Sequence, residues 1–423
     1  MRRLRAKRMI ISLAVPAVML GMTGCGSVKM TLPQTEPEKT ENEVRMLSDS
    51  SVVGKQTNDK LETISDLIDK NFYFEEEEKQ LQDGIIRGYM EALDDPYSVY
   101  YNAEEYASFL EDSGGEYVGV GVQVSQNPDT NVITVVKVFE DGPAEAAGLQ
   151  AEDVIDGVDG EDVSDQDIDT VVKKIRGQEG TDVILNVYRS SDGKKYDLKM
   201  KRRKVENPTV TSKMMDHNIG YVSVSSFYEV TAKQYMESVE ELKEQGMEGL
   251  IVDLRDNGGG LLDIAVEMLD YMLPEGKLVY TEDKEGNVTS EYNSTDDEKF
   301  ELPLVVLVNG YSASASEIFA GAIKDYGTGK LVGTNTFGKG IVQRMFPLND
   351  GSAVKLTIAK YFTPNGNDIH KIGIKPDVEV EFDATAYRES NGEKDNQLDK
   401  AEECMLDMMG VKPASTEEEQ PEE

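Results

Sequence analysis

The sequence predicts an α+β protein of several domains: N-terminal helices, a small β-rich module, an α/β core with a mostly parallel sheet, and a C-terminal helix. Three observations support this prediction. Apolar residues recur every three or four positions between residues 60 and 93, the spacing of amphipathic helices. Short β-rich runs follow over 118–201. From residue 221 onward strands alternate with helices, which favours an α/β layer.

Shifts in composition divide the chain into six segments. Its 423 residues are enough for two or three domains, each with its own core. We expect an export signal or membrane anchor over 1–25, a disordered linker over 26–58, N-terminal helices over 59–115, the β-rich module over 116–203, the core over 204–384, and a C-terminal helix with a disordered acidic tail over 385–423.

Charge and the scarcity of two residue types exclude several classes of protein. Asp and Glu number 81 against 44 Lys and Arg, a net charge of -37, whereas nucleic-acid binders need clustered basic residues. Two cysteines and two histidines cannot supply a disulfide framework or a metal site built on several histidines. We therefore expect no nucleic-acid partner, no metal and no other cofactor.

The first 25 residues have the pattern of a bacterial export signal. Five basic residues precede residue 9, and residues 9–24 are apolar or small except for Pro16, a stretch short for a spanning helix. Residues 22–25, Met-Thr-Gly-Cys, resemble a lipobox, in which Cys25 would be lipidated. An uncleaved signal anchor is the alternative. In both cases we expect the chain to be anchored to the cell membrane and to lie outside the cytoplasm.

The N-terminal region should contain three helices. Apolar positions at helical spacing run from Leu61 to Ile68 and again from Leu81 to Leu93. Asp95-Pro96 ends the second helix, because proline disfavours helix in the residue before it. A third, short helix is expected over 104–110.

The β-rich module has a glycine pattern suited to binding a carboxylate. We expect strands over 120–124, 132–138, 183–188 and 196–200 and one helix over 165–175. Val118, Gly119, Val120 and Gly121 precede or open the first strand. Their glycines would let successive N–H groups converge on one anion, and the strand edge could accept an extended peptide. The alternative is a pair of ordinary turn glycines.

Further along, the same segment resembles a PDZ domain of the kind attached to bacterial proteases. The resemblance is carried by residues 142–149, Gly-Pro-Ala-Glu-Ala-Ala-Gly-Leu, followed by 153–155 and 158–160. Glu152 stands where the family usually has glycine, which alters a turn and not the peptide groove. The resemblance implies that this module recognises protein C-termini.

In the core, Ser314 lies in the turn between an expected strand over 304–308 and an expected helix over 316–326. Such a turn exposes the hydroxyl, and the N–H groups at the helix N-terminus can stabilise an oxyanion. The serines here could instead simply cap the helix. Ser316, with Glu317 directly behind it, is the better capping candidate, which leaves Ser314 for chemistry.

A nucleophilic serine needs a base, and Lys339 is the remaining candidate. Neither His217 nor His370 lies in an obvious catalytic setting. To be neutral near pH 7, Lys339 needs a pKa about 3 units below its ordinary ~10.4, which burial can supply. A solvated surface lysine is one alternative. A Walker A loop over 333–339 is another, but Gly340 occupies the position where that motif requires Ser or Thr.

From residue 60 to about 409 the chain resembles the carboxy-terminal processing peptidases, also called tail-specific proteases. The motifs that carry the resemblance are Leu-Asp-Asp-Pro-Tyr-Ser at 93–98, the inserted PDZ-like module, Asp-Leu-Arg-Asp-Asn-Gly-Gly-Gly at 253–260, and the segments 312–317, 336–343 and 373–377, in the family's order. The resemblance implies a serine protease that needs no cofactor and cleaves proteins with apolar C-termini.

The resemblance also assigns roles to individual residues. It makes Ser314 the nucleophile, Lys339 the general base and Gln343 the residue that orients the lysine. The N–H of Ala315, with one from Gly259 or Gly260, would form the oxyanion hole. It also implies that Arg176 couples peptide occupancy of the PDZ-like module to the protease site, although an arginine at a helix end is also a routine C-terminal cation. Finally, it implies dimerisation through the terminal helices, whose apolar stripes could equally pack within one chain.

Spacing gives a physical expectation for Lys339 and Gln343. The two residues are four apart, so a single helical turn would bring their side chains together. The predicted reaction is endoproteolysis through an acyl-enzyme. One rival is an inactive PDZ scaffold that binds tails without cutting them, and another is a hydrolase that uses His370 as its base.

Overall fold

The computed structural model describes residues 52–128, 130–295 and 299–411 and divides the chain into two compact units, 1–76 and 77–423. In the first unit, helix α1 spans Lys55–Asn71 and buries no residue. Its first residue, Lys55, lies inside the segment predicted to be a disordered linker. The prediction missed this start because the first turn of the helix is polar and carries no apolar periodicity. The predictions for residues 1–25, Cys25 included, lie outside the described residues. Within the described ranges, no helix has the length and apolarity to cross a bilayer.

The second unit begins with two of the predicted helices and a short strand. These are α2 (Glu78–Glu91), β1 (Val99–Tyr101) and α3 (Ala103–Gly114). A capping box starts α3: Asn102 accepts a hydrogen bond from Glu105 N–H at 3.0 Å, and the Glu105 carboxylate accepts one from Asn102 N–H at 2.9 Å. Gly115, at φ 67°, ends the helix.

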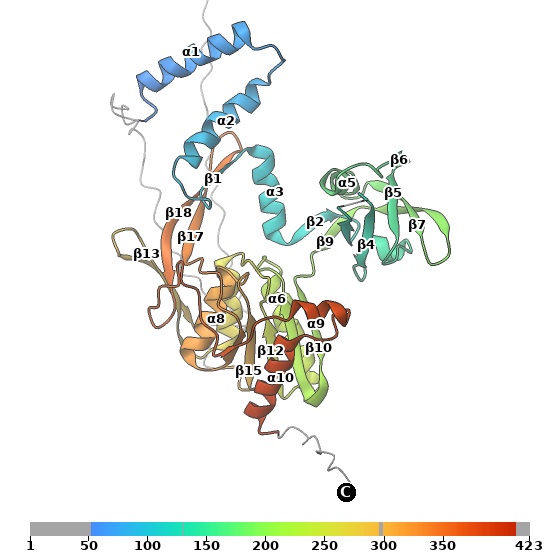
Figure 1. The fold of residues 1–423 in the computed structure, drawn as a ribbon, viewed down its shortest axis with the longest axis vertical. Helices are drawn as coiled ribbons and strands as arrows, with labels where there is room; N and C mark the ends of the chain where they lie inside the picture. The colour runs from blue at the N-terminus through green and yellow to red at the C-terminus, as the bar shows by residue number, and fades with distance from the viewer. Residues whose placement is uncertain (1–51, 129, 296–298, 412–423) are drawn as a thin grey trace, which may run out of the picture. The chain divides into compact units, whose positions relative to one another are not determined.

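An antiparallel sheet with its own core forms the PDZ-like module. Its strands, in sheet order, are β3 (Val122–Gln126), β4 (Ile133–Val138), β5 (Val154–Val158), β7 (Asp182–Arg189) and β8 (Lys194–Lys201), with β6 (Glu161–Asp162) on β5 and the helices α4 (Pro143–Ala146) and α5 (Ile168–Ile175). A separate ribbon of β2 (Glu116–Gly119) and β9 (Arg203–Glu206) precedes and follows this sheet in the chain (Figure 1).

The α/β core is built on a six-stranded sheet. Its order is β10 (Val210–Met214), β11 (Ile219–Val224), β12 (Gly249–Asp253), β15 (Leu304–Val308), β16 (Lys330–Gly333) and β19 (Val378–Glu379). Only the β10–β11 pairing is antiparallel, and the other four are parallel. A 3₁₀ turn at Asp216–Asn218 joins β10 to β11. The predicted mostly parallel sheet is present.

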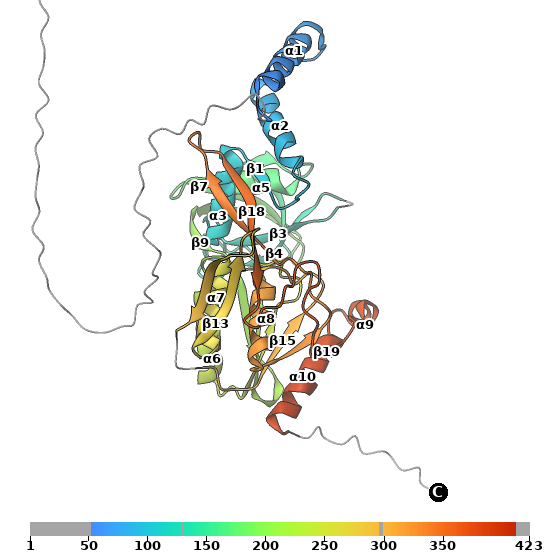
Figure 2. The same cartoon turned by 90° about the vertical axis from the view of Figure 1, so that its left-hand side faces the viewer.

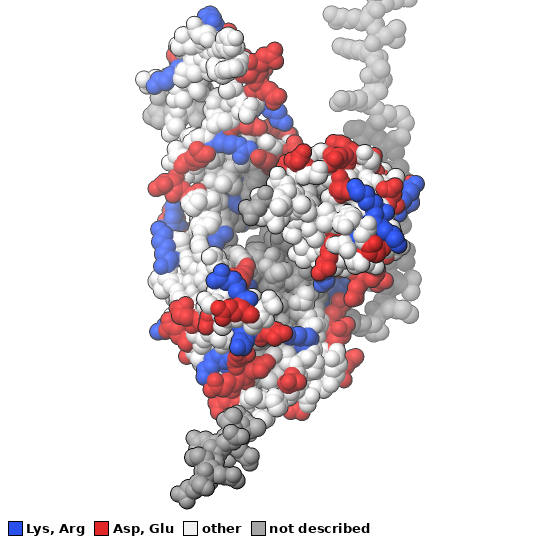
Figure 3. Space-filling model, turned by 45° about the vertical axis from the view of Figure 1, so that its right-hand side comes forward, with Lys and Arg blue, Asp and Glu red and all other residues white. Residues whose placement is uncertain are grey.

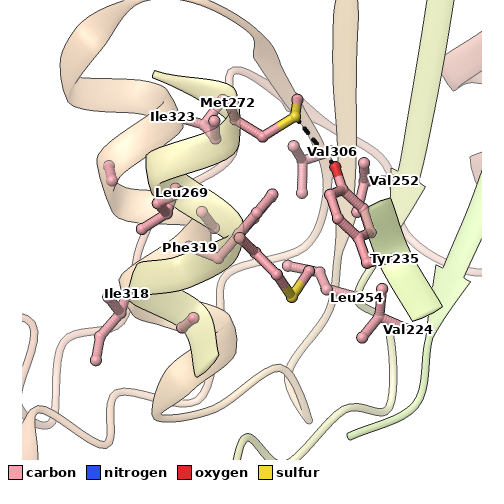
Figure 4. Close-up of a cluster of buried hydrophobic side chains, with 14 of the residues drawn as sticks. Val224, Tyr235, Val252, Leu254, Leu269, Met272, Val306, Ile318, Phe319 and Ile323 are labelled. Carbon is pink, nitrogen blue, oxygen red and sulfur yellow. Dashed lines mark hydrogen bonds between the residues drawn. The ribbon is translucent and has the colours of Figure 1, made fainter. Parts of the chain in front are cut away.

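Helices cover both faces of this sheet, which makes its central strands apolar on both sides. On one face lie α6 (Thr231–Glu244), α7 (Leu262–Met272) and α8 (Ala315–Tyr326), and on the other lies α10 (Asn396–Met409) (Figure 2). In β12, Leu250 and Val252 pack toward the first face and Ile251 toward α10. Each such buried side chain contributes about 1.5–3 kcal/mol. Figure 4 shows this core around Tyr235 and Phe319.

The sequence did not predict a second core sheet, which is antiparallel throughout. It contains β1, β18 (Ala353–Phe362), β13 (Gly276–Glu282) and β14 (Val288–Ser294), with β17 (Ile341–Pro347) also paired to β18. The prediction of a single mostly parallel sheet was therefore incomplete. A further short helix, α9 (Ala384–Glu389), precedes α10 and was also not expected.

The acidic excess is not gathered into one patch on the face that Figure 3 presents. Acidic and basic side chains are interspersed there. This distribution agrees with a solubilising role for the charge.

Candidate active site

The two loops that form the site meet because β12 and β15 are neighbouring parallel strands. Parallel strands end at the same edge of the sheet, where open α/β sheets bind ligands. The loop after β12 contains Gly258–Gly260, and the loop after β15 leads to Ser314. Asn257 joins them: its fully buried main-chain oxygen accepts hydrogen bonds from Ala313 N–H at 3.0 Å and from Ser316 Oγ at 2.9 Å.

Ser314 occupies the N-cap position of α8 in a strained backbone conformation, φ 57° and ψ -116°. A strained strand-to-helix turn with a half-buried serine is a nucleophile elbow. The prediction that Ser316 caps the helix was wrong. Ser316 is the second residue of α8, fully buried, and its hydroxyl donates a hydrogen bond to the Asn257 main-chain oxygen.

A buried carboxylate, Glu317, connects the serine loop to the lysine loop. One of its oxygens accepts hydrogen bonds from Ser314 N–H at 2.9 Å and Lys339 N–H at 2.8 Å. The other accepts from Gly338 N–H at 2.7 Å and Thr336 Oγ1 at 2.6 Å. Hydrogen bonds to an ionised acceptor are stronger than neutral ones. Glu317 therefore fixes the backbones of Ser314 and Lys339 relative to each other.

The Lys339 side chain is half-buried, and its pKa is lowered from the ordinary lysine value. Burial is the main cause, because it penalises the charged ammonium. The positive charge of Lys355 lowers the pKa further, whereas Asp95 and Glu317 oppose the change. The direction of the shift is the one that a general base requires.

Lys339 and Ser314 line the same cleft, which has a volume of about 310 Å³, together with Gly260 and Gln343. Its apolar lining comes from Phe109, Leu261, Leu262, Ile318, Ile341, Val342 and others. Among the described residues no hydrogen bond joins Lys339 Nζ to Ser314 Oγ. Instead, Lys339 Nζ lies 4.5 Å from the centroid of the Tyr97 ring.

Gln343 reaches the cleft from a strand, so the helical turn expected for residues 339–343 is absent. The β17 strand begins at Ile341 and pairs with β18, with a register shift between Val342 and Gln343. Gln343 Nε2 donates to Thr357 Oγ1 at 3.3 Å and to Ile341 O at 3.4 Å. Sequence spacing misled here because an i, i+4 contact presumes a helix.

Two backbone donors next to Ser314 have no acceptor within the described part of the chain. They are the N–H groups of Ala315 and Gly260. Gly259 N–H donates to Asn257 Oδ1 at 2.9 Å and is therefore engaged. Gly259 still has a steric role, because a Cβ at this position would approach Ser314 Cβ to 2.8 Å. Of the two predicted glycine donors, Gly260 is the one left free.

Neither histidine lines this cleft. His217 is exposed in the turn that precedes β11, at the opposite end of the strand from the catalytic loops. His370 packs behind the lysine loop, where a Cβ at Gly340 would come within 2.6 Å of His370 N. Burial lowers the His370 pKa, and its Nδ1 is buried without a partner in the described residues.

A second hollow, of about 400 Å³, lies where the PDZ-like module meets α3 and the core. The module contributes Gly119 and Val120, Val122 and Val124 of β3, and Val172 and Ile175 of α5. The rest of the lining includes Glu111 and Asp112 of α3 and the core residues Asn207, Pro208, Ser225 and Tyr228. Predicted residues Val118 and Gly121 do not line it. Val118 pairs with Lys204 in the β2–β9 ribbon, and Gly121 O accepts a hydrogen bond from Phe139 N–H at 3.0 Å.

Arg176 lies at the rim of this groove. Its guanidinium lies 4.8 Å from the centroid of the Tyr117 ring. Its Nη1 is 3.7 Å from Asp112 and 4.0 Å from Glu111, both on α3. Arg176 therefore contacts both the module and the helix that precedes it.

A nucleophile elbow on the carboxyl edge of a parallel sheet, with a lysine of lowered pKa in the same cleft, is typical of serine hydrolases. Comparison with family models narrows the class. The model described as peptidase family S41 matches residues 218–380, the activating protease CtpB N-terminal domain matches 19–105, and a PDZ domain matches 134–189.

The chain belongs to peptidase family S41. It is 38% identical over 333 residues to the carboxy-terminal processing protease CtpA of Bacillus subtilis (strain 168), which covers 79% of this chain and 71% of that protein. It is 37% identical over 335 residues to a probable CtpA-like serine protease of Staphylococcus aureus (strain COL), covering 78% of this chain and 66% of that relative, slightly under two thirds of its length. The predicted family and the class of serine-type peptidase are confirmed.

Among solved structures, the photosystem II D1 C-terminal processing protease is 31% identical to the chain. The match covers 76% of this chain and 86% of that one, with a TM-score of 0.44.

Proposed function

We propose that this chain is a membrane-anchored extracytoplasmic endopeptidase that captures protein C-termini in its PDZ domain and cleaves them with Ser314 and Lys339. The observation that carries the proposal is the set of hydrogen bonds that the Glu317 carboxylate accepts, which we call the Glu317 clamp. It fixes the backbones of Ser314 and Lys339 at one cleft, where burial lowers the pKa of Lys339. Part of the groove at the PDZ domain is lined by valines and an isoleucine, which suits apolar tail residues, and much of the rest of its lining is polar or charged.

In the proposed reaction the neutral Lys339 amine accepts the proton of Ser314 Oγ as that oxygen attacks the scissile carbonyl. The N–H groups of Ala315 and Gly260 bind the oxyanion of the tetrahedral intermediate. The resulting ammonium donates its proton to the leaving amine, which departs and leaves an acyl-enzyme. Water, deprotonated by the same amine, then releases the acyl product. Gln343, in the same cleft, orients the lysine once it turns toward Ser314.

The direct test compares Ser314→Ala and Lys339→Ala with the unmodified chain, using casein as an unfolded substrate and a fluorophosphonate as a serine label. We expect both variants to lose turnover and Ser314→Ala to lose labelling, while an apolar C-terminal peptide still binds. Full casein turnover by Lys339→Ala, with loss of activity in His370→Gln, would contradict the lysine mechanism. An unmodified chain that binds tails but neither labels nor cleaves would be an inactive scaffold.

Anchoring rests on the pattern of residues 1–25. If Cys25 is lipidated, protein purified from membranes should begin at Cys25, and that residue should carry acyl chains. Mass spectrometry of the N-terminal peptide checks this prediction. An intact Met1 terminus would favour the signal anchor, and a soluble chain cleaved beyond Cys25 would contradict both.

We also propose that the exposed apolar stripe of α2 is covered by a second copy of the chain. Leu81, Ile85, Ile86 and Tyr89 are each at least 38% exposed on this helix, and an apolar stripe of this size is costly to leave in water. A double substitution Ile85→Glu and Ile86→Glu should shift a dimer to monomer in sedimentation. A wild-type chain that remains monomeric across the tested concentrations would contradict this interface.

A further inference from the structure

The Lys339 ammonium contacts the face of the Tyr97 ring and makes no hydrogen bond to Ser314 in the described residues. Its Nζ lies 4.5 Å from the centroid of the Tyr97 ring, within the range of a cation–π contact. Both side chains are half-buried, so this contact is stronger than one in open water. The attraction acts on the charged ammonium, and the neutral amine loses it.

The Tyr97 ring is held by a tight turn over residues 95–98. Asp95 Oδ1 accepts a hydrogen bond from Tyr97 N–H at 3.1 Å, and Asp95 Oδ2 accepts one from Ser98 Oγ at 2.6 Å. Ser98 N–H also donates to Asp95 O at 3.1 Å. This turn is the Asp-Pro-Tyr-Ser motif, for which the proposed reaction has no other role.

The same turn is connected to Gln343. Ser98 Oγ accepts a hydrogen bond from Thr357 N–H at 3.0 Å, and Thr357 Oγ1 accepts one from Gln343 Nε2 at 3.3 Å. The turn therefore contacts Lys339 through an aromatic ring and Gln343 through Thr357. It also lies between α2 and β1, just before α3 and the ribbon that leads to the PDZ domain.

Charged groups from three other elements face Lys339. Lys355 on β18 opposes its positive charge, and Asp95 and Glu317 favour it. His370, in the loop that packs against Gly340, is kept largely neutral near pH 7 because burial lowers its pKa. Among the described residues, Tyr97 is the aromatic ring that contacts the ammonium, and it adds to the groups that favour the charged state.

We propose that Tyr97 is a positioning residue that holds charged Lys339 away from Ser314 and releases it when the amine loses its proton. The proposal rests on the serine–lysine mechanism above. When the ammonium gives its proton to water, the contact with the ring is lost and the neutral amine is free to turn and accept the Ser314 hydroxyl proton. The ring thereby raises the pH at which the base becomes active.

The test is the pH dependence of kcat/KM on a peptide substrate, which reports ionisation of the free enzyme. Tyr97→Leu removes the aromatic face but keeps an apolar side chain over the lysine, so that burial is retained. The acidic limb should move to lower pH by about half to one unit. Tyr97→Phe keeps the face and should leave the limb where it is. The readout is the position of the acidic limb and not the height of the high-pH plateau.

A second series protects the test against misfolding of Tyr97→Leu. Phenylalanines with increasing fluorination at position 97 keep the ring shape but weaken its negative face. The acidic limb should move to lower pH step by step with fluorination. A limb that stays fixed across this series, or moves to higher pH, overturns the role of Tyr97. If the role of Tyr97 is overturned in this way but Lys339→Ala is inactive, the serine–lysine mechanism still holds. If Lys339→Ala is active with a normal acidic limb, both the role of Tyr97 and the serine–lysine mechanism are overturned.

Discussion

At the scale of single residues, Glu317 has two roles that a sequence pattern cannot separate. It is the N3 residue of α8, where an acidic side chain commonly completes a cap. Its carboxylate also accepts hydrogen bonds from the Thr336 hydroxyl and from the N–H groups of Gly338 and Lys339, some twenty positions further on. The sequence analysis connected Glu317 with a cap but placed that cap at Ser316 instead of Ser314. The long-range role exists only once the chain is folded.

Glu317→Gln should reduce both activity and stability. The amide has one acceptor oxygen in place of two, so at least one pair of buried donors loses its partner, at about 1–3 kcal/mol for each unsatisfied group. We expect kcat to fall about 100-fold, since small misplacements of catalytic groups have effects of that size. Casein cleavage and urea unfolding measure the two effects. The matched control is Glu275→Gln, an exposed carboxylate in the same domain; equal behaviour of the two variants would contradict the clamp.

Lys355→Met should move the acidic limb of kcat/KM to higher pH. The positive charge of Lys355 lowers the Lys339 pKa, so its removal lets that pKa rise and reduces the neutral fraction at any pH below it. The direction follows from the sign of the charge, because a neighbouring like charge disfavours the charged form. This direction is opposite to that expected for Tyr97→Leu. An acidic limb that moves to lower pH would contradict the electrostatic account.

At the scale of elements, the site depends on a glycine loop pressed against the serine turn. Gly259 has φ 101°, and a Cβ there would lie 2.6 Å from Ala313 O. Gly310, in the facing loop, has open space instead: the nearest atom to its Cβ would be Asn335 O at 3.9 Å. The two positions therefore offer a matched pair of substitutions.

Gly259→Ala should displace Ser314 and nearly abolish fluorophosphonate labelling, with a stability loss of about 1–3 kcal/mol from overpacking. Gly310→Ala should label at a rate close to that of the unmodified chain. Labelling rates and thermal unfolding of the two variants are the measurements. Normal labelling of Gly259→Ala would mean that the loop is not in contact with the nucleophile.

The same scale shows which elements the sequence could predict. The parallel sheet was predictable because each strand is an apolar run followed by a helix. The second sheet was missed because its strands are joined mainly by hairpins or come from distant segments, such as β1 and β18. For β17, Ile341 and Val342 with Phe346 carried a β signal, but the expectation of a helical turn for Lys339 and Gln343 took precedence.

At the scale of the whole molecule, one chain carries a groove at the PDZ domain and a cleft at Ser314, and Tyr228 lines both. Sequence motifs found both, because the residues of each motif are close together in the chain. They did not find Tyr97 or Asn257 as parts of the site, since each acts through contacts with segments far away in sequence.

Val172→Asp should separate the two sites. It places a charge among the apolar residues of the groove, which should weaken binding of an apolar C-terminal peptide by at least about tenfold, the equivalent of 1.4 kcal/mol. Labelling of Ser314 by a fluorophosphonate in the absence of peptide should be unchanged. Calorimetry and labelling provide the two readouts. Unchanged tail affinity would mean that tails bind elsewhere.

The central claim is that Lys339 is the base for Ser314, and the pH dependence of fluorophosphonate labelling tests it most directly. The unmodified chain should label with an acidic limb whose midpoint lies well below the ~10.4 of a free lysine, and Lys339→Ala should label slowly with that limb gone. If Lys339→Ala labels at the normal rate with the limb intact, another group activates Ser314 and the account is wrong.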